Sequence, residues 1–394
     1  MPPHRAALGD RALFPDLAWR IYLNHAAISP SAAVRHAVDQ AITALARHGV
    51  GAFAALHAQR QRLKTSLARL IGAAPEDIAL VPNTTQGLSA LALCQPWQPG
   101  DHLVVFTGEF PTNVTPWQQA AAAFAARVIA LPIDDLARPD GPDYTRLDAA
   151  LARGVRVVAL SAVQFQTGLR APLAAIAERC HAHGARLAVD GIQAIGSVPL
   201  DVVAEDIDYL VCGGHKWLMG LEGAGFAWAR PDAARELVPR VAGWMSHQDP
   251  TDFLFAPGKL RYDKPIRTRL DFLEGGAQNA IGYAGLEAAV HAIEQIGLEA
   301  ITAHITHWHD HLEPALIDRG FTSRRAPDKA RRSAILSALP PTSPPRPSPT
   351  PSPPRRRRHH PRRPPPLLPH WPNPQREIPE VIAALDEAIT ALRA

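Results

Sequence analysis

Short apolar runs recur through the first 230 residues, and they are the feature that most constrains the fold. Six such runs are rich in Val, Ile and Leu at consecutive rather than alternate positions, and they lie at 78–82, 102–106, 127–132, 155–161, 186–190 and 208–212. A strand has this pattern when helices cover both of its faces. Helical patterns such as 31–49 and 53–72 accompany the runs. The sequence therefore predicts an α/β fold in which helices cover a mainly parallel sheet.

Polar or glycine-rich segments follow several of the predicted strands. They lie at 82–87, 107–113, 161–168, 190–193 and 213–216. In open α/β sheets, ligands bind beyond the carboxyl ends of the strands. We therefore expect the functional site to lie among these segments.

Asp190 and Lys216 are charged residues at the ends of two apolar runs. Considered separately, Asp190 could be a helix N-cap and Lys216 an ordinary loop lysine. They are 26 residues apart, about one strand–crossover–strand unit, so they could lie side by side at the sheet edge. Burial and the neighbouring His215 would lower the pKa of the lysine and make it a better nucleophile. A reactive lysine with a carboxylate for a pyridinium nitrogen is what pyridoxal phosphate (PLP) requires.

A helix predicted to start at 83–85 offers a seat for a phosphate. Asn83, Thr84 and Thr85 would supply hydroxyls and free backbone N–H groups where the helix dipole favours an anion. Ordinary N-capping explains the same residues when they are considered alone. Their place at a strand end, upstream of Asp190 and Lys216, favours the cofactor.

Five segments together resemble the class V aminotransferase family of PLP enzymes, which includes cysteine desulfurases, isopenicillin-N epimerase-like proteins and kynureninase. They are 22–30, 83–88, 108–117, 189–202 and 213–228, and 369–388 adds a sixth likeness near the end. The resemblance implies PLP fold type I: a seven-stranded sheet in an α/β/α large domain, a smaller α+β domain, and a homodimer.

The resemblance also implies a role for individual residues. Lys216 would form the Schiff base with PLP, and Asp190 would hold the ring nitrogen protonated. The remaining cofactor contacts would be Gln193 at the ring oxygen, Phe110 stacked on the ring, and Thr84, Thr85 and His215 at the phosphate. Asn24 and His25 match the segment that lines the substrate pocket in the family.

The expected substrate is a small molecule, an amino acid, with chemistry at its α-carbon. We rank an aminotransferase-type activity first, and an epimerase or lyase of the same family is the alternative. Desulfurases need a nucleophilic cysteine in the later part of the chain, and the last cysteine here is Cys212, so the sequence argues against desulfurase activity. A non-catalytic protein of this fold that binds a partner is a further alternative.

We expect an N-terminal segment at 1–20, a large PLP-binding domain at 21–245 and a small C-terminal domain at 246–394. The small domain is interrupted at 340–370, where 14 prolines and no acidic residue predict disorder. In the family this region supplies an arginine for the substrate carboxylate, and Pro366 stands at its place. A pair of compensating reading-frame shifts would explain the segment, and so would docking to a partner.

The net charge of +4 comes from this Pro/Arg stretch, because 333–370 holds seven arginines and no acid. Nucleic-acid binding is therefore not indicated for the body of the protein. His304, His307 and His311 could share a helix face, but no carboxylate or cysteine pattern completes a metal site, so we expect no metal. No stretch approaches a membrane span and the three cysteines are far apart, so we expect a cytoplasmic protein.

Overall fold

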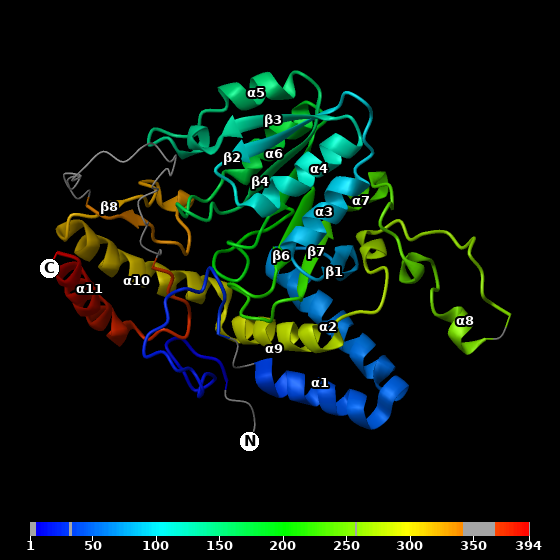
Figure 1. Cartoon of the computed structure of the whole chain (residues 1–394), viewed down its shortest axis with the longest axis horizontal. Coiled ribbons are helices and arrows are strands. Elements are labelled where there is room, and N and C mark those ends of the chain that lie inside the picture. Colours follow the sequence, from blue (N-terminus) through cyan, green and yellow to red (C-terminus); the bar gives the residue numbers. More distant parts are fainter. Residues whose placement is uncertain (1–4, 31–33, 257, 342–366, 394) are drawn as a thin grey trace, which may run out of the picture.

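The computed structural model describes residues 5–30, 34–256, 258–341 and 367–393 (Figure 1). Its main sheet has the strand order β1-β7-β6-β5-β4-β2-β3. The strands are β1 (Ile78–Val81), β2 (His102–Thr107), β3 (Arg127–Pro132), β4 (Val155–Ser161), β5 (Arg186–Asp190), β6 (Tyr209–Gly213) and β7 (Gly225–Ala229). All six predicted runs form strands. Only β7 is antiparallel to its neighbours β1 and β6, so the carboxyl ends of the other six strands meet at one edge.

Helices cover both faces of this sheet. On one face lie α2 (Phe53–Ile71), α5 (Thr145–Leu151), α6 (Leu173–Ala182) and α9 (Ala280–Ile296), and on the other lie α3 (Thr84–Cys94), α4 (Thr115–Ala123) and α7 (Pro231–Glu236). Every residue of β1, β6 and β7 is buried. This two-sided burial explains why the runs are apolar at consecutive positions. The predicted α/β/α sandwich is confirmed.

A third apolar cluster lies outside the sheet layers. It joins α10 (Leu298–Asp318) and α11 (Ile378–Arg393), and the small sheet of β8 (Thr322–Ser323) and β9 (Ala338–Leu339) lies beside it. The long helix α1 (Val34–His48) packs against α9, and the short α8 (Asp252–Phe255) projects from the body (Figure 1). The domain boundary at residue 245 stays a prediction. Most of the predicted disordered stretch, 342–366, lies outside the described residues.

No helix in the part of the chain that the structure describes has the length and hydropathy needed to cross a bilayer.

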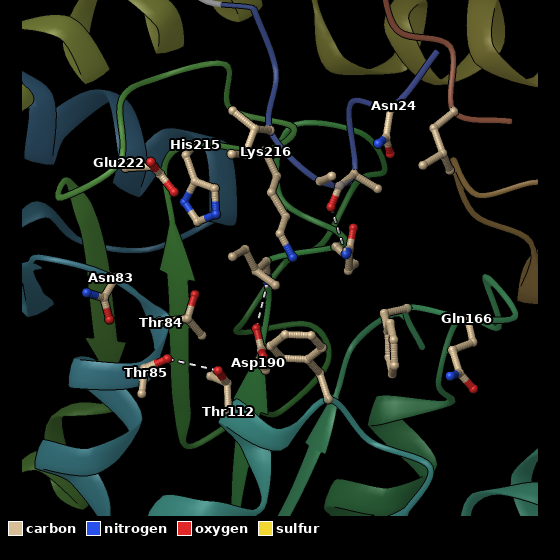
Figure 2. Close-up of a pocket in the computed structure, with 18 of the residues that line it drawn as sticks. Asn24, Asn83, Thr84, Thr85, Thr112, Gln166, Asp190, His215, Lys216 and Glu222 are labelled. Atoms are coloured by element: carbon tan, nitrogen blue, oxygen red, sulfur yellow. Dashed lines mark hydrogen bonds between the residues drawn. The ribbon is translucent and has the colours of Figure 1, made fainter. Parts of the chain in front are cut away.

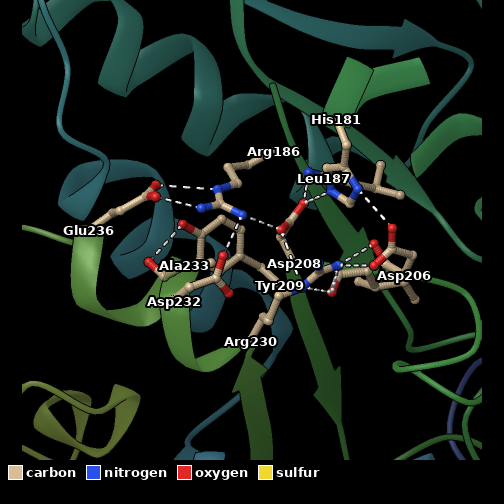
Figure 3. A network of polar contacts seen from close by, with 11 residues as sticks. His181, Arg186, Leu187, Asp206, Asp208, Tyr209, Arg230, Asp232, Ala233 and Glu236 are labelled. Atoms are coloured by element: carbon tan, nitrogen blue, oxygen red, sulfur yellow. Dashed lines mark hydrogen bonds and ion pairs between the residues drawn. The ribbon is translucent and has the colours of Figure 1, made fainter. Parts of the chain in front are cut away.

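A network of ion pairs lies at the amino ends of the parallel strands β5 and β6 (Figure 3). The predicted site lies at the opposite, carboxyl ends of these strands. Asp208 is completely buried and accepts hydrogen bonds from Arg186 Nη1 (2.9 Å), His181 Nε2 (2.8 Å) and the Leu187 N–H (2.7 Å). Arg186 also pairs with Asp232 and Glu236 on α7. The network therefore links the starts of β5 and β6 to one covering helix.

Asp208→Ala should lower the free energy of unfolding by about 3–5 kcal/mol, because it leaves the half-buried Arg186 guanidinium and the buried Leu187 N–H without their shared acceptor. The matched variant Asp232→Ala removes a side chain that is 48% exposed and should cost about 1 kcal/mol or less. Urea denaturation of the two variants checks this expectation. Equal losses would show that the buried carboxylate has no special weight.

Candidate active site

A cavity of about 910 Å³ opens at the carboxyl edge of the sheet (Figure 2). Eight of the nine predicted site residues line it: Asn24, Thr84, Thr85, Phe110, Asp190, Gln193, His215 and Lys216. They come from the N-terminal segment and from the ends of β1, β2, β5 and β6. The sheet topology thus brings together residues that are separated by up to about 190 positions in the chain.

Lys216 points into the cavity from the turn after β6 (Figure 2). The turn is tight because the Gly214 N–H bonds to the Ala224 carbonyl at 2.8 Å, and a Cβ at Gly214 would lie 2.7 Å from that oxygen. The Lys216 Nζ lies 5.6 Å from the centre of the Phe110 ring. Burial lowers the pKa of Lys216, and the charge of Asp190 opposes this shift. The amine is therefore more easily deprotonated than that of an exposed lysine.

Asp190 lies at the floor of the cavity and is 2% exposed. Within the described residues, its carboxylate accepts one hydrogen bond, from the Ile192 N–H at 2.9 Å. Burial raises the pKa of Asp190 to about 6, although this bond and the Lys216 charge act in the opposite direction. The carboxylate is thus only partly compensated. A protonated ring nitrogen is the kind of partner that it lacks, so Asp190 fits the PLP pyridine.

The N-terminus of α3 fits the phosphate. Asn83 caps the helix by accepting from the Gln86 N–H at 2.9 Å, and Thr84 and Thr85, which begin the helix, line the cavity. Their own N–H groups have no acceptor within the helix and suit an anion. Thr84 Oγ1 accepts from the Gly213 N–H at 2.9 Å, so its own hydrogen remains for an anion. Thr85 Oγ1 lies 2.8 Å from Thr112 Oγ1, and His215 lines the same side. Burial first, and then the charge of Lys216, lower the pKa of His215.

Apolar side chains provide walls for a flat ring. Phe110 meets Phe165 edge to face at 5.3 Å, and Ile192 also lines the cavity. Gln193 is fixed on the N-terminal side, because its Oε1 accepts from Trp217 Nε1 at 2.8 Å and its Nε2 donates to the Ala26 carbonyl at 3.2 Å. One amide hydrogen of Gln193 remains for a ring oxygen. The donors and walls together fit PLP.

His25 is the one predicted residue that does not line the cavity. Its buried ring donates from Nε2 to Asn373 Oδ1 at 3.2 Å, and its Nδ1 lies 3.0 Å from Ser29 Oγ. Burial first, and then the neighbouring His370, lower the pKa of His25 well below its usual value. The structure therefore places His25 in a buried polar cluster behind the substrate side.

This cluster ties the two ends of the chain to the lysine turn, and sequence reasoning did not assign it a function. His370 donates from Nε2 to the carbonyl of Trp217, the residue after Lys216, at 2.8 Å. Asn373 Oδ1 accepts from the His370 N–H at 3.0 Å, and Asn373 Nδ2 donates to the Tyr22 carbonyl at 3.0 Å. The only signal in the sequence was the family-like stretch 369–388, which gives no indication of these contacts.

Glu109 is a second residue that the sequence reasoning passed over. It stands just after β2, is 8% exposed, and accepts hydrogen bonds from the N–H (2.8 Å) and hydroxyl (2.5 Å) of Ser161. Burial raises the pKa of Glu109 to about 7, and the charge of Asp190 adds to the rise although the Ser161 bonds oppose it. Glu109 thus joins the end of β2 to the end of β4, beside Phe110 at the cavity wall.

Comparisons with known proteins identify a family. The sequence model described as aminotransferase class V matches residues 21–340. A cysteine desulfurase of Dickeya dadantii is 33% identical over 62% of this chain and 57% of its own length, so that match spans little more than half of the relative. A cysteine desulfurase of Enterobacter sp. is 30% identical over 75% of this chain and 73% of its own length.

Solved structures give a consistent result. The cystine C–S lyase C-DES, in complex with its reaction product cysteine persulfide, is 25% identical, with a TM-score of 0.72 over 83% of this chain and 85% of that chain. A C-DES mutant with glycine covalently linked to its PLP cofactor is 22% identical and supports the fold alone, with a TM-score of 0.79 over 95% of this chain and 98% of that chain.

These relatives overturn one prediction. We expected an aminotransferase-like enzyme and argued against desulfurase activity, but the relatives are named cysteine desulfurases and a C–S lyase. The expectation rested on the lack of a cysteine after Cys212. A late cysteine is needed only to receive sulfur on the protein, and cleavage of the C–S bond does not itself require one. The lack of a late cysteine therefore bears on transfer of sulfur to the protein and not on cleavage of the C–S bond.

Glu109→Gln should change the pH dependence of stability. The carboxyl pKa is raised in the folded state, so the folded protein binds the proton more tightly and loses stability as the pH rises from about 4.5 to about 7. The variant lacks this loss, so its stability relative to the wild type should rise by about 2–3 kcal/mol between pH 5 and pH 8. Urea denaturation across this range measures it. Glu178→Gln, an exposed change on α6, is the control, and a pH-independent difference for Glu109→Gln would contradict the expectation.

Proposed function

The chain belongs to the aminotransferase class V family of PLP-dependent enzymes, and on that premise we propose that it cleaves the carbon–sulfur bond of cysteine or of its disulfide, cystine. The observation that carries the proposal is that the relatives at 25–33% identity, in sequence and in structure, are named for the breaking of this bond. The cofactor is PLP, and the cavity described above offers the side chains that it needs.

Each residue of the cavity takes one task in this proposal. Lys216 holds the cofactor aldehyde, Asp190 faces the ring nitrogen and Phe110 covers the ring. The phosphate lies on Thr84, Thr85 and His215 at the start of α3, and the free amide hydrogen of Gln193 meets the ring oxygen. Asn24 reaches in from the N-terminal segment on the substrate side (Figure 2).

When bound, PLP supplies an electron sink for the α-carbon of the amino acid. Lys216 Nζ removes the α-proton, and its lowered pKa suits it to accept that proton near neutral pH. The electron pair left at the α-carbon would then form a double bond to the β-carbon, while the pair of the C–S bond departs with the sulfur. Asp190 is buried at the cavity floor, away from solvent. Its carboxylate would stabilise the positive charge of the ring nitrogen.

The sulfur leaves in a small product, because the cysteines of this chain cannot receive it. Cys94, Cys180 and Cys212 are all fully buried. Burial raises the pKa of each thiol, and for Cys212 the charge of Asp190 adds to the effect. None of the three lines the cavity. With cystine and water the products are pyruvate, ammonia and cysteine persulfide; with cysteine and water they are pyruvate, ammonia and hydrogen sulfide.

The holoenzyme supplied with L-cystine or L-cysteine should release pyruvate and a sulfane-sulfur or sulfide product in equal amounts. Lys216→Ala should lower the rate ~100-fold or more, because the α-proton then lacks its base. Cys212→Ala, which removes the thiol nearest to the lysine along the chain, should keep a rate close to that of the wild type. A lactate dehydrogenase-coupled assay with sulfide and persulfide detection measures all three proteins. Amino transfer to a keto acid without release of sulfur, or loss of activity in Cys212→Ala while the fold is intact, would refute the proposal.

We also propose that the protein is a homodimer. Large apolar side chains stand exposed on two projecting parts, among them Val50 (86%) between α1 and α2 and Tyr262 (86%) beside α8. Apolar surface of this kind is typical of an interface.

Light scattering should give twice the chain mass of 42.6 kDa, and Tyr262→Glu together with Leu254→Glu should shift the protein toward the monomer because both place a charge on the contact surface. Lys259→Glu, an exposed change of the same charge type between them, tests whether charge alone has this effect. A wild-type protein that is monomeric at micromolar concentration would contradict the proposal.

A further inference from the structure

A second, smaller cavity of about 190 Å³ lies between α10 and the segment 325–334. It shares no lining residue with the active-site cavity. Four cationic side chains and one carboxylate line it, namely Arg170, Arg325, Lys329, Arg332 and Asp310. Thr306 adds a hydroxyl group, whereas the hydroxyls of Thr302 and Ser333 donate to backbone carbonyls. Its lining is therefore strongly basic, in a protein whose remaining body is close to neutral.

Three carboxylates face the four cations, and they form ion pairs with two of them, although the charge of Arg332 also acts on Asp310. Arg325 pairs with Asp310 at 2.6 Å and with Glu313 at 2.9 Å, and Arg170 pairs with Glu205 at 3.2 Å. Lys329 and Arg332 have no ion pair within the described residues. Positive charge is thus left over at the wall formed by the segment 325–334.

One buried donor in this cavity has no partner. The side chain of Arg325 is 3% exposed, yet its Nε donates no hydrogen bond to any described group. A buried guanidinium N–H without an acceptor is costly, and such groups are normally satisfied by protein, water or an ion. An acceptor oxygen within the cavity would remove this deficit. The unpaired Nε of Arg325 thus points to an acceptor in the cavity, whatever the balance of charges in its lining.

Two of the basic side chains, those of Arg332 and Arg170, are held by backbone carbonyls, whereas Lys329 is exposed. Arg332 donates from Nε to the Ala326 carbonyl at 2.8 Å and from Nη2 to the Pro327 carbonyl at 3.2 Å, and Arg170 donates from Nη2 to the Pro199 carbonyl at 2.8 Å. The segment 325–334 is also tied to the connection between β4 and α6, because the Arg170 N–H bonds to the Arg331 carbonyl at 2.9 Å. The entropy of ordering these long side chains is therefore already spent, which favours binding.

We infer that this cavity is a binding site for a small tetrahedral oxyanion, namely phosphate, sulfate or the phosphate group of a small metabolite. Forked guanidinium donors match such anions, and an ammonium adds a point charge. A volume of about 190 Å³ admits one such ion with a few waters. Only Ile335 and Leu336 separate Ala334, in this cavity, from Ser337 in the active-site cavity. A bound anion would thus hold in place the segment 325–334, which leads directly to Ser337 in the active-site cavity.

The test uses the PLP-loaded enzyme, in which the cofactor fills the phosphate seat at α3. Calorimetric titration with sodium phosphate at constant ionic strength should show one saturable site per chain. Arg332→Gln and Lys329→Gln should each weaken binding by about tenfold or more, since each removes a charged donor. Arg153→Gln, an exposed change in the turn between α5 and β4, should leave it unchanged.

Parallel titrations with sulfate and glycerol 3-phosphate distinguish the possible sources of the anion. Similar affinity for all three indicates a site for a free inorganic anion, and at least tenfold tighter binding of glycerol 3-phosphate indicates a phosphorylated metabolite. Absence of saturation, or equal affinity in Arg332→Gln, Lys329→Gln and the wild type, would overturn the inference. Circular dichroism of each variant confirms that it is folded. The result does not depend on whether the enzyme cleaves C–S bonds.

Discussion

The structure depends on the burial of two opposite charges, Asp190 and Lys216, at the carboxyl edge of one sheet. Desolvation raises the pKa of Asp190 and lowers the pKa of Lys216, so it favours the neutral form of each group. The attraction between the two charges opposes both shifts. Neither group is fully compensated by the protein alone. A ligand that is cationic where it meets the carboxylate and electrophilic where it meets the amine satisfies both groups, and this dual requirement selects a pyridoxal cofactor.

The fold provides the geometry for this pair. Because β1 to β6 run in one direction, their ends deliver the phosphate seat, the ring walls, the carboxylate and the lysine to one place. The lysine turn is then fixed from its other side. His370 bonds to the Trp217 carbonyl and Gln193 bonds to the Trp217 indole, so the chain is anchored directly after Lys216. An anchored turn costs less reorganisation when the amine must act, so we regard His370 and Gln193 as positioning residues.

The sequence predicted what local patterns encode. Consecutive apolar residues identified six strands, and the residue types at their ends identified part of the cavity, including Asp190 and Lys216. The family resemblance added Asn24, Phe110 and Gln193. The prediction that His25 lines the substrate pocket differs from the structure, because Asn24 faces the cavity while the His25 ring turns toward Asn373. Asn24 forms an isolated β-bridge outside any regular strand, so no sequence periodicity shows which neighbour faces the cavity. The contacts of Glu109 with Ser161 and of His370 with Trp217 join positions 52 and 153 residues apart. Only the tertiary fold reveals such pairs.

The cysteines separate two requirements that the sequence reasoning had combined. Breaking a C–S bond needs a base at the α-carbon and an electron sink, and the cavity has a place for both. Keeping the sulfur on the protein needs an accessible thiolate, and Cys94, Cys180 and Cys212 are packed into the apolar layers on either side of the sheet. A thiol in such a layer stays protonated and cannot reach a substrate. Under the proposed function, cleavage of the C–S bond therefore does not involve a thiol of this chain. The sulfur must leave as a stable anion, because no protein thiolate is there to receive it. For the proposed cleavage, the group that leaves cystine is a persulfide and the group that leaves cysteine is hydrosulfide. The persulfide has the lower pKa and is the better leaving group, so the proposal favours cystine over cysteine.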